Sequence, residues 1–190
     1  ILGCSIFMIL VIGNYAKQGG GLAIETASTV QATDCTVDGN QAPSGAGIFV
    51  RDDCVVAIED CAIVNNQITA DFGNGGGIAL QNSDVTISGC TISYNLTLGY
   101  GGGIACTNNV TGTIFDCWIE GNTAEGNYNE GAGIYMSQSA PYVHNVVIAD
   151  NQASGPYSEG GGVATSFTPS PTFEQCTLVG NGCSPQGTAG

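Results

Sequence analysis

Basic residues are almost absent from this chain. Only two of its 190 residues are lysine or arginine, Lys17 and Arg51, whereas sixteen are aspartate or glutamate, so the formal net charge at pH 7 is −14. A surface of this charge repels the phosphate backbone of nucleic acids and disfavours anionic lipids and anionic polysaccharides. We therefore expect no nucleic-acid partner.

Zinc motifs and membrane-spanning runs are also missing. The only histidine is His144, and no Cys-x-x-Cys or Cys/His pair has the spacing of a zinc site. The apolar stretch over residues 1–12 is too short to cross a bilayer, and no basic segment precedes it as in a signal peptide. We expect no metal site of this kind and no transmembrane segment, and we interpret residues 1–12 as half of a coil.

Helical periodicity is missing too. Apolar residues alternate with other residues over short runs, as at Val56 and Ile58 or at Val85 and Ile87, and never recur at helical spacing over ten residues. Alternation with a period of two in runs this short is typical of β-strands. The chain is therefore predicted to be all-β.

What the chain has instead is a pair of motifs that recurs every 26–30 residues. The first motif is Gly-x-Gly followed by an aliphatic residue, and the second is Cys-x-aliphatic-x-x-Asn, in which Ile9 and Val146 replace the cysteine in two copies. The seven asparagines are Asn14, Asn40, Asn66, Asn95, Asn122, Asn151 and Asn181, and the five cysteines are Cys35, Cys61, Cys90, Cys117 and Cys176.

Self-similarity at this period is the signature of a solenoid, whose repeats stack to bury one continuous core. Each repeat has room for three short strands. We predict a right-handed parallel β-helix of about seven rungs that forms a single domain over residues 1–190. We also expect the chain to be a fragment of a longer protein or the unit of a polymer.

The repeated asparagines and cysteines have architectural explanations. Stacked asparagines hydrogen-bond to one another through their amides, and asparagine tolerates the left-handed backbone of a sharp corner. A position that exchanges cysteine with isoleucine and valine faces an apolar interior, where a free thiol behaves as a small hydrophobe. We predict an asparagine ladder and a cysteine ladder, and the rung spacing leaves an occasional disulfide open.

The paired motifs resemble the GGA[ILV]/FxxN repeats of polymorphic outer-membrane proteins and, more widely, those of secreted right-handed β-helix proteins. The resemblance covers nearly the whole chain, although Ile, Val or Leu replaces the phenylalanine of the family and a cysteine precedes it by two residues. It implies an extracellular β-helix that serves as a stalk, adhesin or passenger. It specifies the fold much more closely than an activity.

Length variation is concentrated between the asparagine and the next glycines. The longest such loops span residues 67–74, 123–130 and 152–159, and they carry acidic and aromatic residues without a positive charge. Insertions that collect at one corner of a solenoid emerge on one side, which is often the binding side.

Three aspartates offer the main hint of catalysis. Asp34, Asp60 and Asp116 share the position before a ladder cysteine, although Gly89 interrupts the row. Carboxylates that converge on one face are the arrangement of a glycosidase, whereas an aspartate at a corner is explained by a hydrogen bond to its own turn. We favour the second explanation.

His144 and Arg51 are the remaining candidates for acid–base chemistry. His144 shares a register position with Glu174 one rung away, which suits a general acid–base pair but suits a surface contact better. Arg51 precedes two aspartates, Asp52 and Asp53, and is interpreted as part of a loop ion pair. We therefore assign no catalytic residue and lean against an enzyme.

Calcium and glycans are the other ligands that the sequence brings into view. Carboxylates stacked at strand spacing can share a calcium ion with backbone carbonyls, but the Gly-Gly-x-Gly-x-Asp calcium motif is missing. Two N-glycosylation sequons begin at Asn95 and Asn109, and Asn109 is the better candidate because Asn95 belongs to the ladder.

These observations favour a non-enzymatic structural or adhesive β-helix that lies outside the cell or on its surface. We expect copies to stack head to tail into a filament, because an open β-helix end presents unpaired strands and because Phe7, Met8, Leu10 and Ile12 point outward. Carbohydrate and host or cell-surface proteins are the other expected partners. The alternative is a carbohydrate-active enzyme, similar to polysaccharide lyases or hydrolases, or a carbohydrate-binding β-helix.

Overall fold

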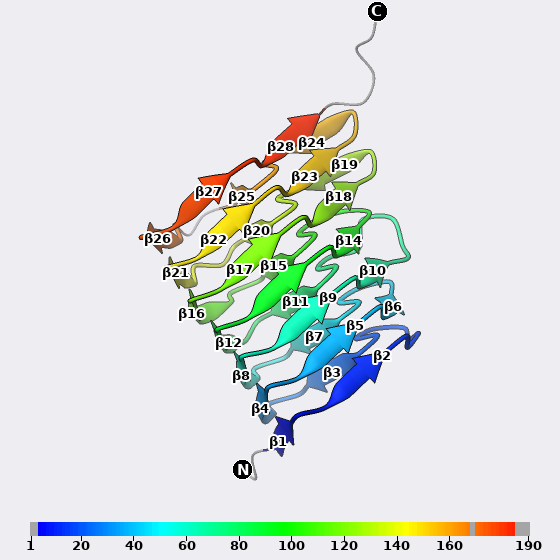
Figure 1. Cartoon of the computed structure of the whole chain (residues 1–190), viewed down its shortest axis with the longest axis vertical. Helices are drawn as coiled ribbons and strands as arrows, with labels where there is room; N and C mark the ends of the chain where they lie inside the picture. Colours follow the sequence, from blue (N-terminus) through cyan, green and yellow to red (C-terminus); the bar gives the residue numbers. More distant parts are fainter. Residues whose placement is uncertain (1–3, 168–169, 185–190) are drawn as a thin grey trace, which may run out of the picture.

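The chain forms a stack of coils built from parallel β-strands (Figure 1). The computed structural model describes residues 4–167 and 170–184, which contain strands and turns but no helix. Every pair of neighbouring strands is parallel, because each strand pairs with its equivalents in the coils before and after it. The predicted all-β solenoid is confirmed.

Four sheets run along the stack. The first holds β1 (Cys4–Phe7), β4 (Thr29–Thr33), β8 (Val55–Glu59), β12 (Asp84–Ser88), β16 (Thr111–Phe115), β21 (Tyr142–His144) and β26 (Thr172–Glu174). The second holds β2 (Leu10–Ile12), β5 (Thr36–Asp38), β9 (Ala62–Val64), β13 (Thr91–Ser93), β17 (Trp118–Glu120), β22 (Val147–Ala149) and β27 (Thr177–Val179).

The other two sheets have six strands each. The third holds β6 (Gln41–Ala42), β10 (Gln67–Ile68), β14 (Leu96–Thr97), β18 (Thr123–Glu125), β23 (Gln152–Ser154) and β28 (Gly182–Ser184). The fourth holds β3 (Leu22–Glu25), β7 (Ile48–Arg51), β11 (Ile78–Gln81), β15 (Ile104–Thr107), β20 (Ile134–Ser137) and β25 (Val163–Ser166). A small two-stranded sheet pairs β19 (Tyr128–Glu130) with β24 (Tyr157–Glu159) in the insertion loops.

The expectation of three strands per rung is wrong, because the third sheet supplies a fourth. Its strands follow the ladder asparagine directly and are only two or three residues long. Five of the six bury one residue, the second of the strand, such as Ile68 or Ala124. A run this short shows no alternation that sequence periodicity could detect.

Aliphatic columns fill the interior of the stack. Val37, Ile63, Ile92, Ile119 and Ile148 occupy one position in successive coils, and each is fully buried. Equivalent residues of neighbouring parallel strands lie about 4.8 Å apart, so each side chain packs on the same position of the next coil. The core is therefore continuous from coil to coil.

The apolar N-terminal stretch belongs to the stack. Val11 pairs in register with Val37, so residues 4–12 form part of a coil as predicted, whereas residues 1–3 lie outside the described residues. Outward positions of this coil are solvent-exposed, with Phe7 59% and Met8 72% accessible. Leu10 and Ile12 are exposed in the same way.

Left-handed residues turn the corners, but not at the positions we expected. The backbone with positive φ lies one residue before each ladder asparagine, as at Asn65 and Tyr94, and not at the asparagine itself. The ladder asparagine keeps an ordinary backbone while its side chain turns into the stack. Another corner turns at the residue before each ladder cysteine, where Asp34, Asp60 and Asp116 have φ of 52–54°.

Candidate functional sites

The seven repeat asparagines form a hydrogen-bonded column at the corner between the second and third sheets. Each Nδ2 donates to Oδ1 of the next asparagine at 2.9–3.0 Å, from Asn14 through to Asn181. Each Oδ1 also accepts the backbone N–H of the preceding asparagine. From Asn40 onward, Nδ2 donates a second bond to a carbonyl of the coil before.

The ladder distinguishes the asparagines of the two glycosylation sequons, because only one of them belongs to it. Asn95 is fully buried, and both hydrogens of its amide are used by Asn122 and Ile63. A glycan on Asn95 would break the ladder. Asn109 lies exposed at the corner between the fourth and first sheets, with φ of 66°. Asn109 is therefore the sequon that the folded chain can carry in glycosylated form.

The repeat cysteines form a second column at the corner between the first and second sheets. Cys35, Cys61, Cys90 and Cys117 are 1–3% accessible, and Val146 continues the column in the next coil. Each thiol lies within donating distance of two carbonyls, one two residues before it and one in the previous coil; for Cys90 these are Ser88 at 3.2 Å and Ile58 at 3.4 Å. All nine cysteines are free thiols.

The thiols of this column influence one another's protonation. The thiol of Cys117 raises the pKa of Cys90 to about 12, with burial contributing in the same direction. The same contact lowers the pKa of Cys117. The pKa of Cys61 is raised by its contact with Cys90 and by burial.

The three aspartates of the predicted row serve as corner residues. Asp116 accepts a hydrogen bond from Nδ2 of Asn145 in the next coil at 2.6 Å, so it bonds to a neighbouring corner and not to its own turn. The carboxylate of Asp60 lies over Gly89, where a Cβ atom would collide with it. This contact explains why glycine interrupts the row.

His144 is part of an aromatic cluster on the outer face of the first sheet. Its ring stacks on that of Phe115 in the preceding coil, with centroids 5.0 Å apart. The ring of Tyr142, two residues earlier on the same strand, lies 4.8 Å from it. Glu174 is its register partner in the next coil and accepts the hydroxyl hydrogen bond of Tyr142. Stacking and hydrogen bonding occupy this cluster, which agrees with the interpretation of a surface contact.

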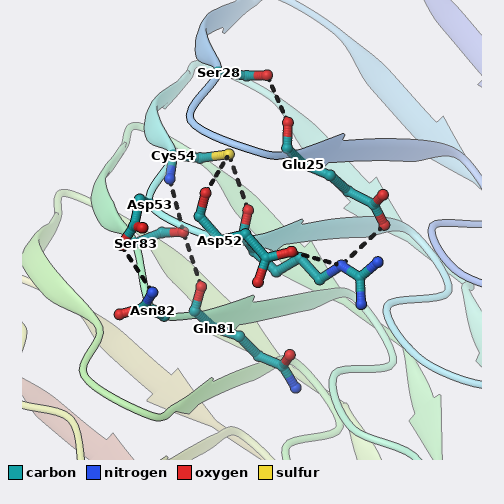
Figure 2. A network of polar contacts seen from close by, with 9 residues as sticks. Glu25, Ser28, Asp52, Asp53, Cys54, Gln81, Asn82 and Ser83 are labelled. Atoms are coloured by element: carbon teal, nitrogen blue, oxygen red, sulfur yellow. Dashed lines mark hydrogen bonds and ion pairs between the residues drawn. The ribbon is translucent and has the colours of Figure 1, made fainter.

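Arg51 joins two coils through an ion pair (Figure 2). Its Nε lies 3.2 Å from a carboxylate oxygen of Glu25 in the coil before and 3.2 Å from one of Asp52. Asp53 turns the other way and accepts a hydrogen bond from Nδ2 of Asn82 at 2.8 Å. The predicted loop ion pair therefore includes Asp52 and Glu25, but not Asp53.

An open cavity of about 430 Å³ lies over the outer face of the first sheet. Its lining includes the polar side chains of Thr29, Gln31 and Thr86, with Val55 and Ala57 as an apolar floor. A second cavity of about 240 Å³ shares Val55 and Asp84 with it and extends to the exposed corner; it is lined by Asp53, Cys54, Val55, Asn82, Ser83, Asp84, Asn109 and Thr111. The two cavities adjoin at Val55 and Asp84 and together form a shallow groove of mixed polar and apolar lining.

Sequence reasoning missed this groove. The only signal was the set of small and polar residues that alternate with the core positions of β4, β8 and β12. These residues vary from coil to coil, so they do not stand out against the repeat.

The insertion loops carry an aromatic stack. The rings of Tyr128 and Tyr157 are nearly parallel, with centroids 4.6 Å apart, and Phe72 reaches Tyr128 across the shorter coil between them at 6.4 Å. The three residues are each at least 49% exposed to solvent. The facing sides of the two tyrosine rings nevertheless cover each other. The stack therefore shows ring edges and hydroxyls to solvent and offers no free face between the tyrosines on which a sugar could lie.

Within residues 4–167 and 170–184, no three or more His, Cys, Asp or Glu side chains converge in a way that could hold a metal ion. The same part of the chain has no helix that is long and apolar enough to cross a membrane.

Comparison with known proteins identifies the repeat. A family model for the right-handed β-helix region matches residues 20–189, which is most of the chain. Neither the curated proteins nor the solved structures include a match.

Proposed function

Because the chain belongs to the right-handed β-helix family, which defines an architecture and not a reaction, we propose that it is a non-enzymatic structural or adhesive element outside the cell. The observation behind this proposal is that many polar side chains form hydrogen bonds between neighbouring coils. The asparagine and cysteine columns bond coil to coil, and Asp116, Asn145, Asp53 and Asn82 do the same at the corners. These groups hold the stack together.

The asparagine ladder also has a direction, which supports association end to end. Every bond between two ladder asparagines runs from Nδ2 to Oδ1 of the higher-numbered coil. A coil added before Asn14 would donate to its Oδ1, and a coil added after Asn181 would accept from its Nδ2, which otherwise donates to Ile148. A further coil of the same repeat meets both requirements. We propose that copies of this segment stack head to tail through these groups.

Sedimentation of the 190-residue chain over a range of concentrations tests this proposal. We expect the weight-average mass to rise with concentration, and Asn181→Leu to weaken the association at least tenfold. Asn109→Leu is the matched control, because Asn109 is exposed and lies outside the ladder. A monomer at every concentration, or equal weakening by both variants, would rule out stacking through the ladder.

Binding of a neutral carbohydrate is the second candidate, and the groove on the first sheet favours it. Hydroxyls, amides and the carboxylates of Asp53 and Asp84 line the groove beside apolar residues, no basic side chain is among the lining residues, and one coil advances about 4.8 Å, close to the length of a sugar unit. Calcium enters this proposal only as an added ion that bridges carboxylates and ligand.

Calorimetry with cellohexaose, with and without calcium, tests the second candidate. We expect binding that Thr86→Val and Gln31→Ala weaken and that Thr36→Val, on the outer face of the second sheet, leaves unchanged. Release of shorter sugars that stops in Asp60→Asn would instead identify an enzyme. Absence of binding to cellohexaose and other uncharged oligosaccharides would eliminate the groove as a glycan site.

A further inference from the structure

The cysteine column places several free thiols next to one another, and thiols can bind metal ions as well as pack in a core. Four thiols follow one another in consecutive coils without interruption: Cys35, Cys61, Cys90 and Cys117. Each lies at the same corner position, and the residue after Cys61, Cys90 and Cys117 donates its backbone N–H to the carbonyl of the preceding column cysteine at 2.9 Å. The backbone N–H of Cys35 also donates to Sγ of Cys61 at 3.4 Å, so this sulfur accepts a hydrogen bond.

The cysteines of the column are free thiols. Residues in register on parallel strands keep their Cβ atoms about one strand spacing apart, about 4.8 Å. Most disulfides have Cβ atoms about 3.5–4.5 Å apart, so a bridge within the column would draw two coils slightly closer together.

The same separation suits a cation held between two sulfurs. Twice a metal–thiolate bond of about 2.3 Å is about 4.6 Å, close to the spacing of the coils. Thiolates select soft cations such as Cu(I). Zinc needs four ligands in a tetrahedron, and no third His, Cys, Asp or Glu joins these thiols in the described part of the chain.

We propose that the cysteine column is a binding site for soft monovalent d10 cations, with one ion held linearly between Cys35 and Cys61 and a second between Cys90 and Cys117. In each site two S–H bonds break, two sulfur–metal bonds form and two protons leave, so the bis-thiolate complex carries one negative charge. No electron transfer is involved.

A neighbouring group supports this exchange. The N–H of Cys35 can stabilise the thiolate of Cys61. Because protons are released, binding should tighten as pH rises.

Silver(I), added as the nitrate in chloride-free buffer to the reduced full-length chain, is a suitable probe because it does not change oxidation state. We expect native mass spectrometry to show two tightly held silver ions, a pH-stat to record two protons released per ion, and X-ray absorption to show two sulfur neighbours. Sulfur counts of three or more would overturn the linear site.

Two double variants separate the column from the other thiols. Cys61→Val/Cys117→Val removes one partner from each pair, and valine already occupies this position at Val146. The control, Cys54→Val/Cys106→Val, removes two buried thiols outside the column. We expect the first variant to lose both ions and the control to keep them.

Equal silver binding in the two variants would contradict the proposal, because the ions would then belong to other cysteines, such as the exposed Cys4 and Cys183. Disulfides formed within the column of the native protein would contradict it as well. The X-ray absorption measurement needs no variant, so the site remains testable if a substitution prevents folding.

Discussion

At the scale of the residue, Asn95 shows what one ladder amide does. Its Oδ1 accepts both the backbone N–H and Nδ2 of Asn66, and its Nδ2 donates to Asn122 and Ile63. All of these groups are buried, so water cannot replace the side chain. The ladder is therefore a set of mutually dependent bonds.

Replacing Asn95 with alanine should lower the free energy of unfolding by about 3 kcal/mol, because buried donors that lose their acceptor cost about 1–3 kcal/mol each. Urea unfolding followed by circular dichroism measures the loss. Asn109→Ala, at an exposed corner, should change stability by less than about 0.5 kcal/mol. Equal effects of the two substitutions would show that the ladder contributes no particular stability.

Glu130 provides a prediction about pH. Burial and the carboxylate of Glu159, its register partner in the next coil, raise the pKa of Glu130 above 4.5. Protonation of Glu130 therefore stabilises the folded chain. This contribution to the free energy of unfolding is complete below pH 4.5 and is lost as pH rises through the higher pKa of the folded state.

Glu130→Gln should therefore raise the melting temperature relative to the native chain at pH 7, and this gain should shrink as pH falls toward 4. Glu159→Gln should act in the same direction because it removes the neighbouring charge. Differential scanning calorimetry across this range provides the comparison. A gain that grows as pH falls would have the wrong sign for the proposed cause.

Single residues also show where sequence reasoning stopped. The repeat identified the seven asparagines, but it did not reveal that the residue before each one takes the left-handed backbone. That position holds glycine, asparagine, tyrosine or aspartate, for example Gly39, Asn65 and Tyr94, so no single residue type marks it. The packed corner selects the conformation, and the local sequence only permits it.

At the scale of the element, the corner between the third and fourth sheets depends on close backbone contact. A Cβ atom at Gly103 would lie 2.6 Å from the carbonyl oxygen of Gly133 in the next coil and 3.1 Å from the ladder amide of Asn122. A side chain is excluded at the third position of the motif, whereas Ala46 and Ala132 fit at the second. The repeated glycine therefore reflects packing between coils.

Gly103→Ala should destabilise the fold by more than about 2 kcal/mol, because backbone must shift in two coils. Gly39→Ala is the matched control: its φ is 64° but a Cβ atom there meets nothing within 4 Å, so it should cost only the left-handed strain of about 1–2 kcal/mol. Thermal unfolding ranks the two. A larger loss for Gly39→Ala would show that backbone strain outweighs packing.

Elements differ in how far the sequence predicts them. The first, second and fourth sheets follow from alternation and from the glycine motif, because their inward residues repeat in every coil. The strands of the third sheet bury at most one residue each, such as Ala42 or Ile68, and the loops that follow them vary in length. The groove was also beyond prediction, because its lining comes from outward residues that do not repeat.

At the scale of the whole molecule, the charge and the ladders favour different contacts. Two basic residues against sixteen acidic ones give the chain a net charge of −14, so stacks that lie side by side should repel one another. The ladder offers hydrogen bonds only along the axis. Association should therefore be end to end and unbundled, with bundles appearing only when salt screens the sides.

Electron microscopy of the negatively stained native chain tests this account most directly. We predict single, unbranched fibres one coil in width that lengthen with protein concentration and that Asn181→Leu shortens. Isolated short rods at every concentration, in both the native chain and the variant, would contradict a role as a stacking structural element.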